Sequence, residues 1–565
     1  MSVPLLRSMF RAPALNKTRQ TGHTSGDGLG MRVGGTGRER EVVTLRAIAT
    51  EAGLNTRLEA SLPQLLPAFL PRQRWFGGKA RTVAQVDLED AAWLPPGAVS
   101  CALTIVAVRY TDGSRERYGM LLGLLDDPGG LPTLGRVEGG TGGGPAWIVE
   151  AAGLPEAAVA LFAGFVSPRE LPTVRGAKLR YGDIAAGSDG TLRQEMLVAD
   201  SVRLLGAEQS NTSIRIGRSH VFKLFRRLGD GENPEVEITR FLTGRTSFRA
   251  VPGLRGSLAY EPATGPASTL GVLQDWVEND GDGWSYTVAA LREILRGGAS
   301  TDALYSDMRR LGEITGEFHA ALASYPAALA FAPEPATSRD LKGWKSSLAT
   351  RAECLCRLLA ERLTGLPSDV RPLAESLLGR RGRFEKLALA PDLDARRGFA
   401  KIRVHGDFHL GQTLKVATGF VLFDFEGEPA RPLAERRAKH CALKDVAGML
   451  RSFDYAVATA RGAELDGQDS LAGLCEQASA LADQPVHTDP PGQVPLLREA
   501  FLEGYRGRAR GAVFLPSDQG TLAAWLDFFE LDKALYEVEY EVNNRPDWVA
   551  IPLEGMRRIM ERLVE

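Results

Sequence analysis

The 565-residue sequence predicts an α+β protein that folds as more than one unit. A chain of this length exceeds what a single hydrophobic core usually supports. Short apolar runs separated by tight turns fill much of the first half, and helical patterns dominate after about residue 271. These observations predict a small α/β beginning, a strand-rich middle and a helical second half.

Composition narrows the range of partners and compartments. Hydrophobic residues make up 44% of the chain, charged residues 24%, and the formal net charge is −2. This balance fits an ordinary globular protein and gives no field that would attract nucleic acid or an anionic membrane. No run of 18 apolar residues is present to span a bilayer, and five cysteines favour a reducing compartment without disulfides. We therefore expect a cytoplasmic monomer.

The first 150 residues divide into an extension and a small folded unit. Residues 1–41 are rich in Gly, Thr, Ser and Arg without a periodic apolar face, which predicts a disordered extension. Residues 42–150 are expected to begin with helix, broken at Gly53 and at the prolines. Two apolar runs in "CALTIVAVRYTDGSRERYGMLLGLL" flank Asp112-Gly113 and predict a β-hairpin. The stretch "PGGLPTLGRVEGGTGGGPAW" is predicted to be a flexible surface loop.

Two further units follow, residues 151–272 and residues 273–565. The first opens with a predicted helix, "PEAAVALFAGFVS". Within it, "EMLVADSVRLLGAEQSNTSIRIGRSHVFKLFRRL" predicts strands joined by tight turns. The second is expected to be mainly helical, with an excursion over residues 458–496 that ends in a Pro-rich loop.

The stretch "VHGDFHLGQTLKVATGFVLFDFEGEP", residues 404–429, crowds polar groups between apolar runs. Asp424 follows the strand-like run Phe420–Phe423, a position that suits a metal ligand at a cleft. Oxygen ligands from Asp424 and Gln412 suit Mg²⁺, and Asp407 would then be free to accept a proton from a hydroxyl. The alternative is an ordinary H-G-D turn. His405 is expected to brace the loop through hydrogen bonds.

This combination resembles the catalytic and metal-binding loops of aminoglycoside phosphotransferase-like kinases, which have a eukaryotic-kinase-like fold. The matching pattern is H-G-D, a Gln five residues after the aspartate, and D-F-E seventeen residues after it. The resemblance implies that Asp407 is the catalytic base, that Gln412 and Asp424 bind metal, and that ATP and Mg²⁺ are the cofactors. Glu426 stands where many relatives have Asp, so a metal contact of Glu426 stays open.

A kinase needs further parts, and the sequence upstream offers candidates. Lys223 interrupts an apolar strand, where a surface-facing lysine is the ordinary interpretation, but in a kinase it would bind the nucleotide phosphates. Its glutamate partner is predicted to be Glu237, with Glu235 as the alternative, on a helix that starts at Pro234. A strand turn and the backbone between the lobes supply further candidate nucleotide contacts: Ser210, Asn211, Thr212 and Ser213, then Gln274, Trp276 and Val277. The strand turn could equally be a plain hairpin.

Longer blocks, from about residue 70 onward, look like the actinobacterial maltokinases. They include "RQRWFGGKAR", "HGDFHLGQ", "DFEGEPARPLAERR" and "LDKALYEVEYEVNNRPDWVAIPL". The resemblance implies a bilobal protein-kinase-like fold with an N-terminal cap subdomain and a mainly helical C-lobe. Residues 42–150 would be the cap, residues 151–272 the intermediate subdomain of the N-lobe, and residues 273–565 the C-lobe.

The same resemblance implies a reaction. Maltokinases transfer phosphate from ATP to the anomeric hydroxyl of maltose, which gives maltose 1-phosphate for glycogen and other α-glucans. The family also contains glucosamine kinases, which phosphorylate C6, so glucosamine is the alternative acceptor. An aminoglycoside-type phosphotransferase and a catalytically inactive, kinase-like binding protein are the remaining alternatives.

Sugar contacts are predicted in the C-lobe. Tyr536 and Tyr540 lie four residues apart, and so do Glu537 and Glu541, so each pair shares a helix face. Carboxylates accept hydrogen bonds from sugar hydroxyls and could equally hold an ammonium group. The alternative is an amphipathic helix with a solvated acidic stripe. The complete set of candidate sugar contacts is His409, Arg451, Asp454, Tyr455, Tyr536, Glu537, Tyr540, Glu541, Asn544, Arg545 and Trp548.

Overall fold

The computed structural model describes most of the chain after residue 50. The described residues are 51–562, without 96–98, 138–144, 168, 183–189, 207–209, 369, 381, 383–397, 430 and 466–492. The predicted extension at residues 1–41 lies outside them. Of the predicted excursion, residues 458–465 continue one helix, residues 493–496 begin another, and the rest lies outside the described residues.

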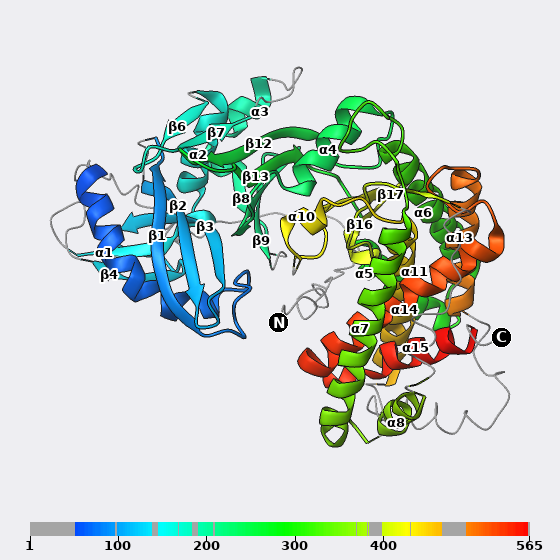
Figure 1. Cartoon of the computed structure of the whole chain (residues 1–565). Coiled ribbons are helices and arrows are strands. Elements are labelled where there is room, and N and C mark those ends of the chain that lie inside the picture. The colour runs from blue at the N-terminus through cyan, green and yellow to red at the C-terminus, as the bar shows by residue number, and fades with distance from the viewer. Residues whose placement is uncertain are drawn as a thin grey trace, which may run out of the picture.

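A cap unit forms one end of the molecule (Figure 1). One helix covers an antiparallel sheet of order β1-β2-β3-β5-β4, and a strand from the next unit, β11, pairs with β3. The elements are α1 Glu51–Phe69, β1 Val83–Trp93, β2 Ser100–Tyr110, β3 Arg115–Leu125, β4 Thr133–Val137 and β5 Ala146–Glu150. The predicted hairpin is confirmed: Arg109 pairs with Arg115 across the turn, where Gly113 has a φ of 80°.

Two details of the cap differ from the expectations. The helix α1 runs through Gly53, Pro63 and Pro67 without a break. Apolar side chains spaced by four residues on α1, Leu58, Leu62 and Leu66, are buried against the sheet, and this packing outweighs the local cost of the prolines. The segment predicted to be a flexible loop contains β4, which pairs with β5.

The middle unit is a second antiparallel sheet, of order β6-β7-β12-β13-β10-β9-β8. Its strands are β6 Glu170–Pro172, β7 Lys178–Tyr181, β8 Val202–Leu204, β9 Asn211–Ile216, β10 His220–Phe225, β11 Arg227–Leu228, β12 Leu254–Glu261 and β13 Ser268–Asp275. Its helices are α2 Pro155–Val166, as predicted, α3 Gly190–Glu195 and α4 Pro234–Arg245. The cap sheet, α2 and this sheet bury one shared hydrophobic core, because β2 and β3 face α2 while β10 packs on it from the other side.

The C-lobe is mainly helical and lies at the other end of the molecule (Figure 1). Its helices are α5 Gly283–Leu295, α6 Thr301–Leu322, α7 Ser338–Arg362, α8 Arg371–Gly379, α10 Leu433–Arg436, α11 Leu443–Leu465, α13 Gln493–Ala509, α14 Gln519–Asn544 and α15 Ala550–Arg562. Two strand pairs accompany them: β14 Glu334–Pro335 with β15 Ala400–Lys401, and β16 Thr413–Val416 with β17 Gly419–Leu422. No helix within the described residues is long and apolar enough to cross a membrane.

Candidate active site

The polar stretch at residues 404–429 lies between the middle sheet and the C-lobe helices. Figure 1 shows β16, β17 and α10 in yellow beneath the middle sheet. Thr413 pairs with Leu422 and Val416 with Gly419, so β16 and β17 form a hairpin. This hairpin places the loop before β16 and the loop after β17 side by side at the face that meets the N-lobe.

The loop before β16 carries Asp407 and is held by a buried carboxylate. Asp445 of α11 accepts hydrogen bonds from the backbone N–H groups of His405, at 2.7 Å, and Gly406, at 2.9 Å. Gly406 has a φ of 87°, a conformation that other residues adopt at a cost. The predicted role of His405 as a brace is confirmed, since its Nε2 lies 3.0 Å from the carbonyl oxygen of Phe423.

Asp445 was not predicted from the sequence. Its Oδ2 atom, which accepts from the His405 N–H, also lies 3.1 Å from Nε2 of His319 on α6, whose other ring nitrogen lies 3.0 Å from the hydroxyl of Tyr505 on α13. All three side chains are buried, so this chain of hydrogen bonds anchors the Asp407 loop to three helices of the C-lobe core. An aspartate in the first turn of a helix is common, so Asp445 carried no distinctive signal in the sequence.

The loop after β17 carries Asp424 in a strained conformation. Its φ is 65°, and it is the single non-glycine residue with a positive φ among the residues that the structure describes. Such outliers persist where surrounding contacts hold them, and they cluster at functional sites. Here the Lys223 ammonium donates to the Asp424 carboxylate, and Gln412 also hydrogen-bonds to it. Although burial opposes ionisation, these contacts hold the pKa of Asp424 below its usual value.

Lys223 is surrounded by more carboxylates than one ammonium can balance. It is buried, on β10, and its Nζ lies 3.3 Å from Glu235 and 3.0 Å from Glu426, in addition to its contact with Asp424. Oxygen atoms of these three acids lie within 4.8 Å of one another. Burial, and the neighbouring charges of Asp424 and Glu426, raise the pKa of Glu235 to about 8 against the opposing effect of Lys223. Glu235 therefore holds a proton at neutral pH, and the all-oxygen donors of the cluster fit a Mg²⁺ ion that would replace this proton.

Glu237 was predicted to be the partner of Lys223, and this prediction was wrong. Glu235, the alternative, contacts Lys223, whereas Glu237 binds Arg403 at 2.7 Å and Arg437 at 3.0 Å. The helix α4 does start at Pro234, with Asn233 as its N-cap. Residues two apart on a helix point in different directions, so the choice depends on how α4 is rotated against the sheet.

The segment Ser210–Ser213 lies beside Lys223. Ser213 pairs with Lys223 in the register of β9 and β10. Asn211 reaches across to the C-lobe, where its Nδ2 donates to Glu426, and it also contacts the hydroxyl of Ser210. The hydroxyl of Thr212 accepts from Arg226 at 2.8 Å. The segment thus lies against the charged cluster, and its binding of nucleotide stays a prediction.

The predicted adenine contacts need a correction. Gln274 lies inside the sheet, paired with Val221 on one side and Leu254 on the other, and its side-chain amide donates to Glu235 at 3.1 Å. The N–H of Trp276 donates to the Ser219 carbonyl at 2.7 Å. Both groups are already used within the protein, and the Val277 carbonyl accepts from the Asn279 side chain at 2.8 Å. Adenine binding by the remaining backbone groups of Trp276 and Val277 stays a prediction.

Asp407 is paired with a lysine that the sequence analysis did not single out. Lys533 of α14 lies 3.3 Å from its carboxylate, and the two side chains are about equally accessible, at 21% and 22%. Burial lowers the pKa of Lys533, but Asp407, Glu428 and Glu537 outweigh it and hold that pKa above its usual value. Lys533 belongs to the block "LDKALYE", in which the sequence analysis weighted the tyrosines and glutamates instead.

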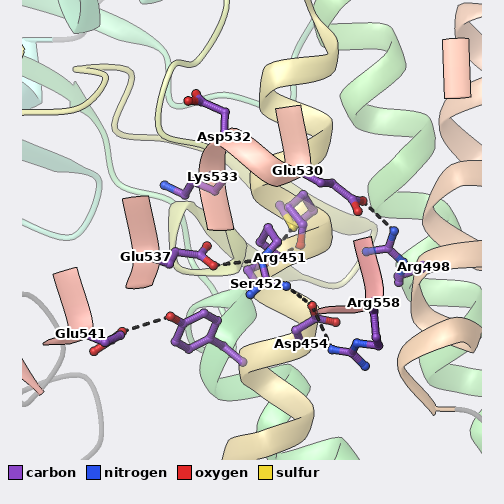
Figure 2. Close-up of polar contacts among 12 residues, drawn as sticks. Arg451, Ser452, Asp454, Arg498, Glu530, Asp532, Lys533, Glu537, Glu541 and Arg558 are labelled. Atoms are coloured by element: carbon purple, nitrogen blue, oxygen red, sulfur yellow. Dashed lines mark hydrogen bonds and ion pairs between the residues drawn. The ribbon is translucent and has the colours of Figure 1, made fainter. Parts of the chain in front are cut away.

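Five of the predicted sugar contacts are instead part of a buried network. Figure 2 shows Arg451 of α11 between Asp454 and Glu537, whose carboxylate lies 2.9 Å from the guanidinium. The hydroxyl of Tyr455 donates to Glu541 at 3.1 Å. Arg451 and Glu541 are each 1% exposed, so no sugar can reach them without opening the core. These two side chains, with Asp454, Tyr455 and Glu537, therefore tie α11 to α14 and are corrected from sugar contacts to structural residues.

The remaining predicted sugar contacts are partly accessible on α14 and just after it, or lie in the loop before β16. Tyr536 and Tyr540 stack with ring centroids 6.4 Å apart and are half-buried. Asn544, Arg545 and Trp548 continue this side of α14, where the Arg545 guanidinium lies over Tyr540 and Trp548. His409 accepts a hydrogen bond from the Gly411 N–H, and burial lowers its pKa. None of these contacts tests sugar binding.

Comparison with known proteins finds a matching family model over the cap and similar sequences over more of the chain. A family model described as the maltokinase N-terminal cap domain matches residues 69–153. A glucosamine kinase of Mycolicibacterium smegmatis is 26% identical over 365 residues, which span 64% of this chain and 79% of that protein. A glucosamine kinase of Streptacidiphilus jiangxiensis is 31% identical over 251 residues, which span 44% of this chain and about half of that protein, 53%.

Solved structures agree on the fold. A glucosamine kinase in complex with glucosamine, ADP and inorganic phosphate matches with a TM-score of 0.55 at 22% identity, and the match covers 84% of this chain and 93% of that one. A second crystal form of a glucosamine kinase matches with a TM-score of 0.58 at 21% identity, over 89% and 99%. The predicted bilobal, kinase-like α+β fold with an N-terminal cap is thereby confirmed. The chain is thus similar in sequence to glucosamine kinases, carries a match to the maltokinase N-terminal cap domain, and shares the fold of the solved glucosamine kinases.

Proposed function

We propose that this sugar kinase transfers the γ-phosphoryl group of ATP to glucosamine. The observation that carries the proposal is the position of Asp407, which lies on the braced loop outside the Lys223 cluster and is half-exposed beside Lys533. A carboxylate in this position can meet an acceptor hydroxyl while the acids around Lys223 face the nucleotide. Glucosamine is favoured over other acceptors because both named relatives are glucosamine kinases.

The reaction follows from these side chains. As the acceptor oxygen bonds to the γ-phosphorus, Asp407 accepts the hydroxyl proton, the bond from that phosphorus to the bridging oxygen breaks, and ADP leaves. Lys533 would hold the carboxylate of Asp407 toward the acceptor, and Lys223 would bind the nucleotide phosphates. Asp424, Gln412 and Glu426 would hold Mg²⁺, which would neutralise charge on those phosphates.

Maltose is the second candidate acceptor, and two observations favour it. The cap match carries the maltokinase name, although the cap packs on the N-lobe and not beside Asp407. Next to Asp407, the ammonium of Lys533 and the stacked rings of Tyr536 and Tyr540 suit a neutral saccharide with an apolar face better than a second ammonium.

A panel of acceptors tests the proposal. Glucosamine, maltose, glucose, maltotriose and an aminoglycoside would each be incubated with the protein, ATP and Mg²⁺, and the products examined by phosphorus NMR. Glucosamine phosphorylated at C6 gives a triplet from the two C6 protons, whereas maltose 1-phosphate gives a doublet from the C1 proton. The Asp407→Asn variant is the control for sugar-independent ATP hydrolysis. Absence of any sugar phosphate with the whole panel would contradict the proposal and favour a kinase-like binding protein.

A further inference from the structure

Arg226 lies where the cap, the middle sheet and the segment Ser210–Ser213 meet. It connects β10 to β11 and is 2% exposed, which is rare for an arginine without several partners. No part of the reaction described above uses this side chain. Its contacts divide into a set on the cap and a set on the nucleotide side.

On the cap side, the Arg226 guanidinium contacts residues of the cap. Its Nη1 donates to Glu150 at 2.9 Å and to the carbonyl oxygen of Gly119 at 3.3 Å, and it lies 5.1 Å from the ring centre of Trp75. The backbone is joined as well, because the Gly119 N–H donates to the Arg226 carbonyl at 2.8 Å. Glu150 is buried too, so this ion pair is shielded from solvent.

On the nucleotide side, the same residue fixes two consecutive side chains. Its Nε donates to the Thr212 hydroxyl at 2.8 Å, and its backbone N–H donates to Asn211 Oδ1 at 3.3 Å. With its oxygen held in this way, Asn211 directs its Nδ2 toward Glu426, which in turn contacts Lys223. A continuous set of polar contacts therefore runs from Glu150 of the cap to the charged cluster of the cleft.

We propose that Arg226 is a positioning residue through which the cap orders the Ser210–Ser213 segment and Glu426 for binding of magnesium nucleotide. The inference rests on the proposed function, since it takes the cleft to be the nucleotide site. A buried guanidinium that loses one set of partners is left with unpaired charge, so the cap contacts and the nucleotide-side contacts hold each other in place. A phosphate-binding backbone must keep its N–H groups aligned, and Arg226 supplies that constraint from outside the site.

The test compares three full-length variants for binding of Mg²⁺-ADP by calorimetry and for the KM values of ATP and sugar. Arg226→Gln and Glu150→Gln are each expected to weaken Mg²⁺-ADP binding by about tenfold or more, as expected for the loss of a charged hydrogen bond, with the sugar KM unchanged. Arg117→Gln is the matched control. Arg117 also joins the cap to the middle sheet, through Ser268 at 2.6 Å and Asp230, but contacts neither Asn211 nor Thr212.

The outcomes separate the coupling from a purely structural role. If Arg226→Gln and Arg117→Gln bind Mg²⁺-ADP equally at a similar loss of thermal midpoint, Arg226 only fastens the cap and the inference is overturned. Should Arg226→Gln fail to fold, Thr212→Val removes one hydroxyl and is expected to weaken Mg²⁺-ADP binding several-fold, about the effect of one neutral hydrogen bond; unchanged binding in that variant would overturn the inference. A wild-type protein that binds no Mg²⁺-ADP would overturn the proposed function itself.

Discussion

The cleft and the C-lobe each hold a cluster of acidic and basic side chains, and the two clusters have different roles. In the cleft, Lys223 meets Glu235, Asp424 and Glu426, so one ammonium faces three carboxylates. In the C-lobe, Arg451 and Arg558 meet Asp454 and Glu537 (Figure 2), and Arg545 meets Glu541, three cations for three carboxylates. The cleft has Lys223 and Arg436, 3.9 Å from Glu426, for three carboxyl groups, and the proton that Glu235 holds below its pKa of about 8 balances them.

The difference lies in charge balance and access, not in ion-pair distance. The C-lobe cluster is balanced and buried, so it needs nothing from outside the protein. The cleft cluster is balanced only while Glu235 holds a proton, includes the strained Asp424, and leaves that side chain 27% exposed. A cluster that is incomplete in this way is expected to bind a cation, whereas a complete one is expected to stabilise the fold.

The largest expected effect is on the rate of phosphoryl transfer at the cleft. Asp407→Asn removes the general base and is expected to lower kcat by about 10²–10⁴-fold. Mg²⁺-ADP binding should be unchanged, because Asp407 lies outside the Lys223 cluster and contacts Lys533. Steady-state kinetics and calorimetry on the same preparation measure both. A variant that keeps more than about a tenth of the wild-type kcat would remove Asp407 from the role of base.

The next largest effect is on the stability of the protein and tests the C-lobe cluster. Arg451→Met leaves Asp454 and Glu537 without their shared cation, and breaking a buried pair in this way costs about 3–5 kcal/mol of unfolding free energy. Urea unfolding measures the loss, and the KM values for sugar and ATP should stay unchanged in the folded protein. Arg557→Gln is the control, since its pair with Glu554 is partly exposed and is worth at most about 1 kcal/mol. A raised sugar KM with unchanged stability would return Arg451 to the acceptor site.

These two regions also show which site residues the sequence alone could predict. Asp407, Gln412 and Asp424 could be found because their spacing within one short stretch fixes their relative positions. Lys533 and Asp445 could not, because each meets the Asp407 loop from a helix far away in the chain, and only tertiary packing brings them there.

The same limit explains the errors. Carboxylates spaced by four residues on α14 predicted an open sugar-binding face, but Arg451 arrives from α11 and pairs with Glu537. The choice between Glu235 and Glu237 depended on the rotation of α4, which the apolar pattern of one turn does not determine. Local elements such as the β2–β3 hairpin and α2 were predicted correctly, because turn chemistry and short-range periodicity specify them.

A smaller effect probes the metal ligands of the cleft. Gln412→Ala removes a neutral hydrogen bond to Asp424, worth about 0.5–1.5 kcal/mol, so a loss of activity of up to about tenfold is expected. Because the carboxylate ligands remain, raised Mg²⁺ should restore part of that loss. Titration of activity against Mg²⁺ concentration decides the point. A defect that does not change with Mg²⁺ would exclude Gln412 from the metal site.

A pH dependence of stability is expected in addition. The pKa of Glu235 is raised to about 8 in the folded protein, above the ordinary value of 4.5, so the folded state holds the proton more tightly. The contribution of Glu235 to the unfolding free energy is therefore complete below about pH 4.5 and is lost as the pH rises toward about 8. Urea unfolding across this range should show a smaller decline in Glu235→Gln than in the wild type. Parallel curves would contradict the raised pKa.

The most direct test of the contrast between the two clusters compares Asp424→Asn with Glu537→Gln. Each replaces one ion-paired carboxylate by its amide, one in the cleft and one in the C-lobe. Calorimetry would measure Mg²⁺-dependent binding of ADP, and thermal unfolding would measure stability. We expect Asp424→Asn to lose the Mg²⁺-dependent part of binding while keeping its thermal midpoint, and Glu537→Gln to bind ADP normally with a lowered midpoint. The opposite pattern, with ADP binding lost in Glu537→Gln and retained in Asp424→Asn, would contradict the account.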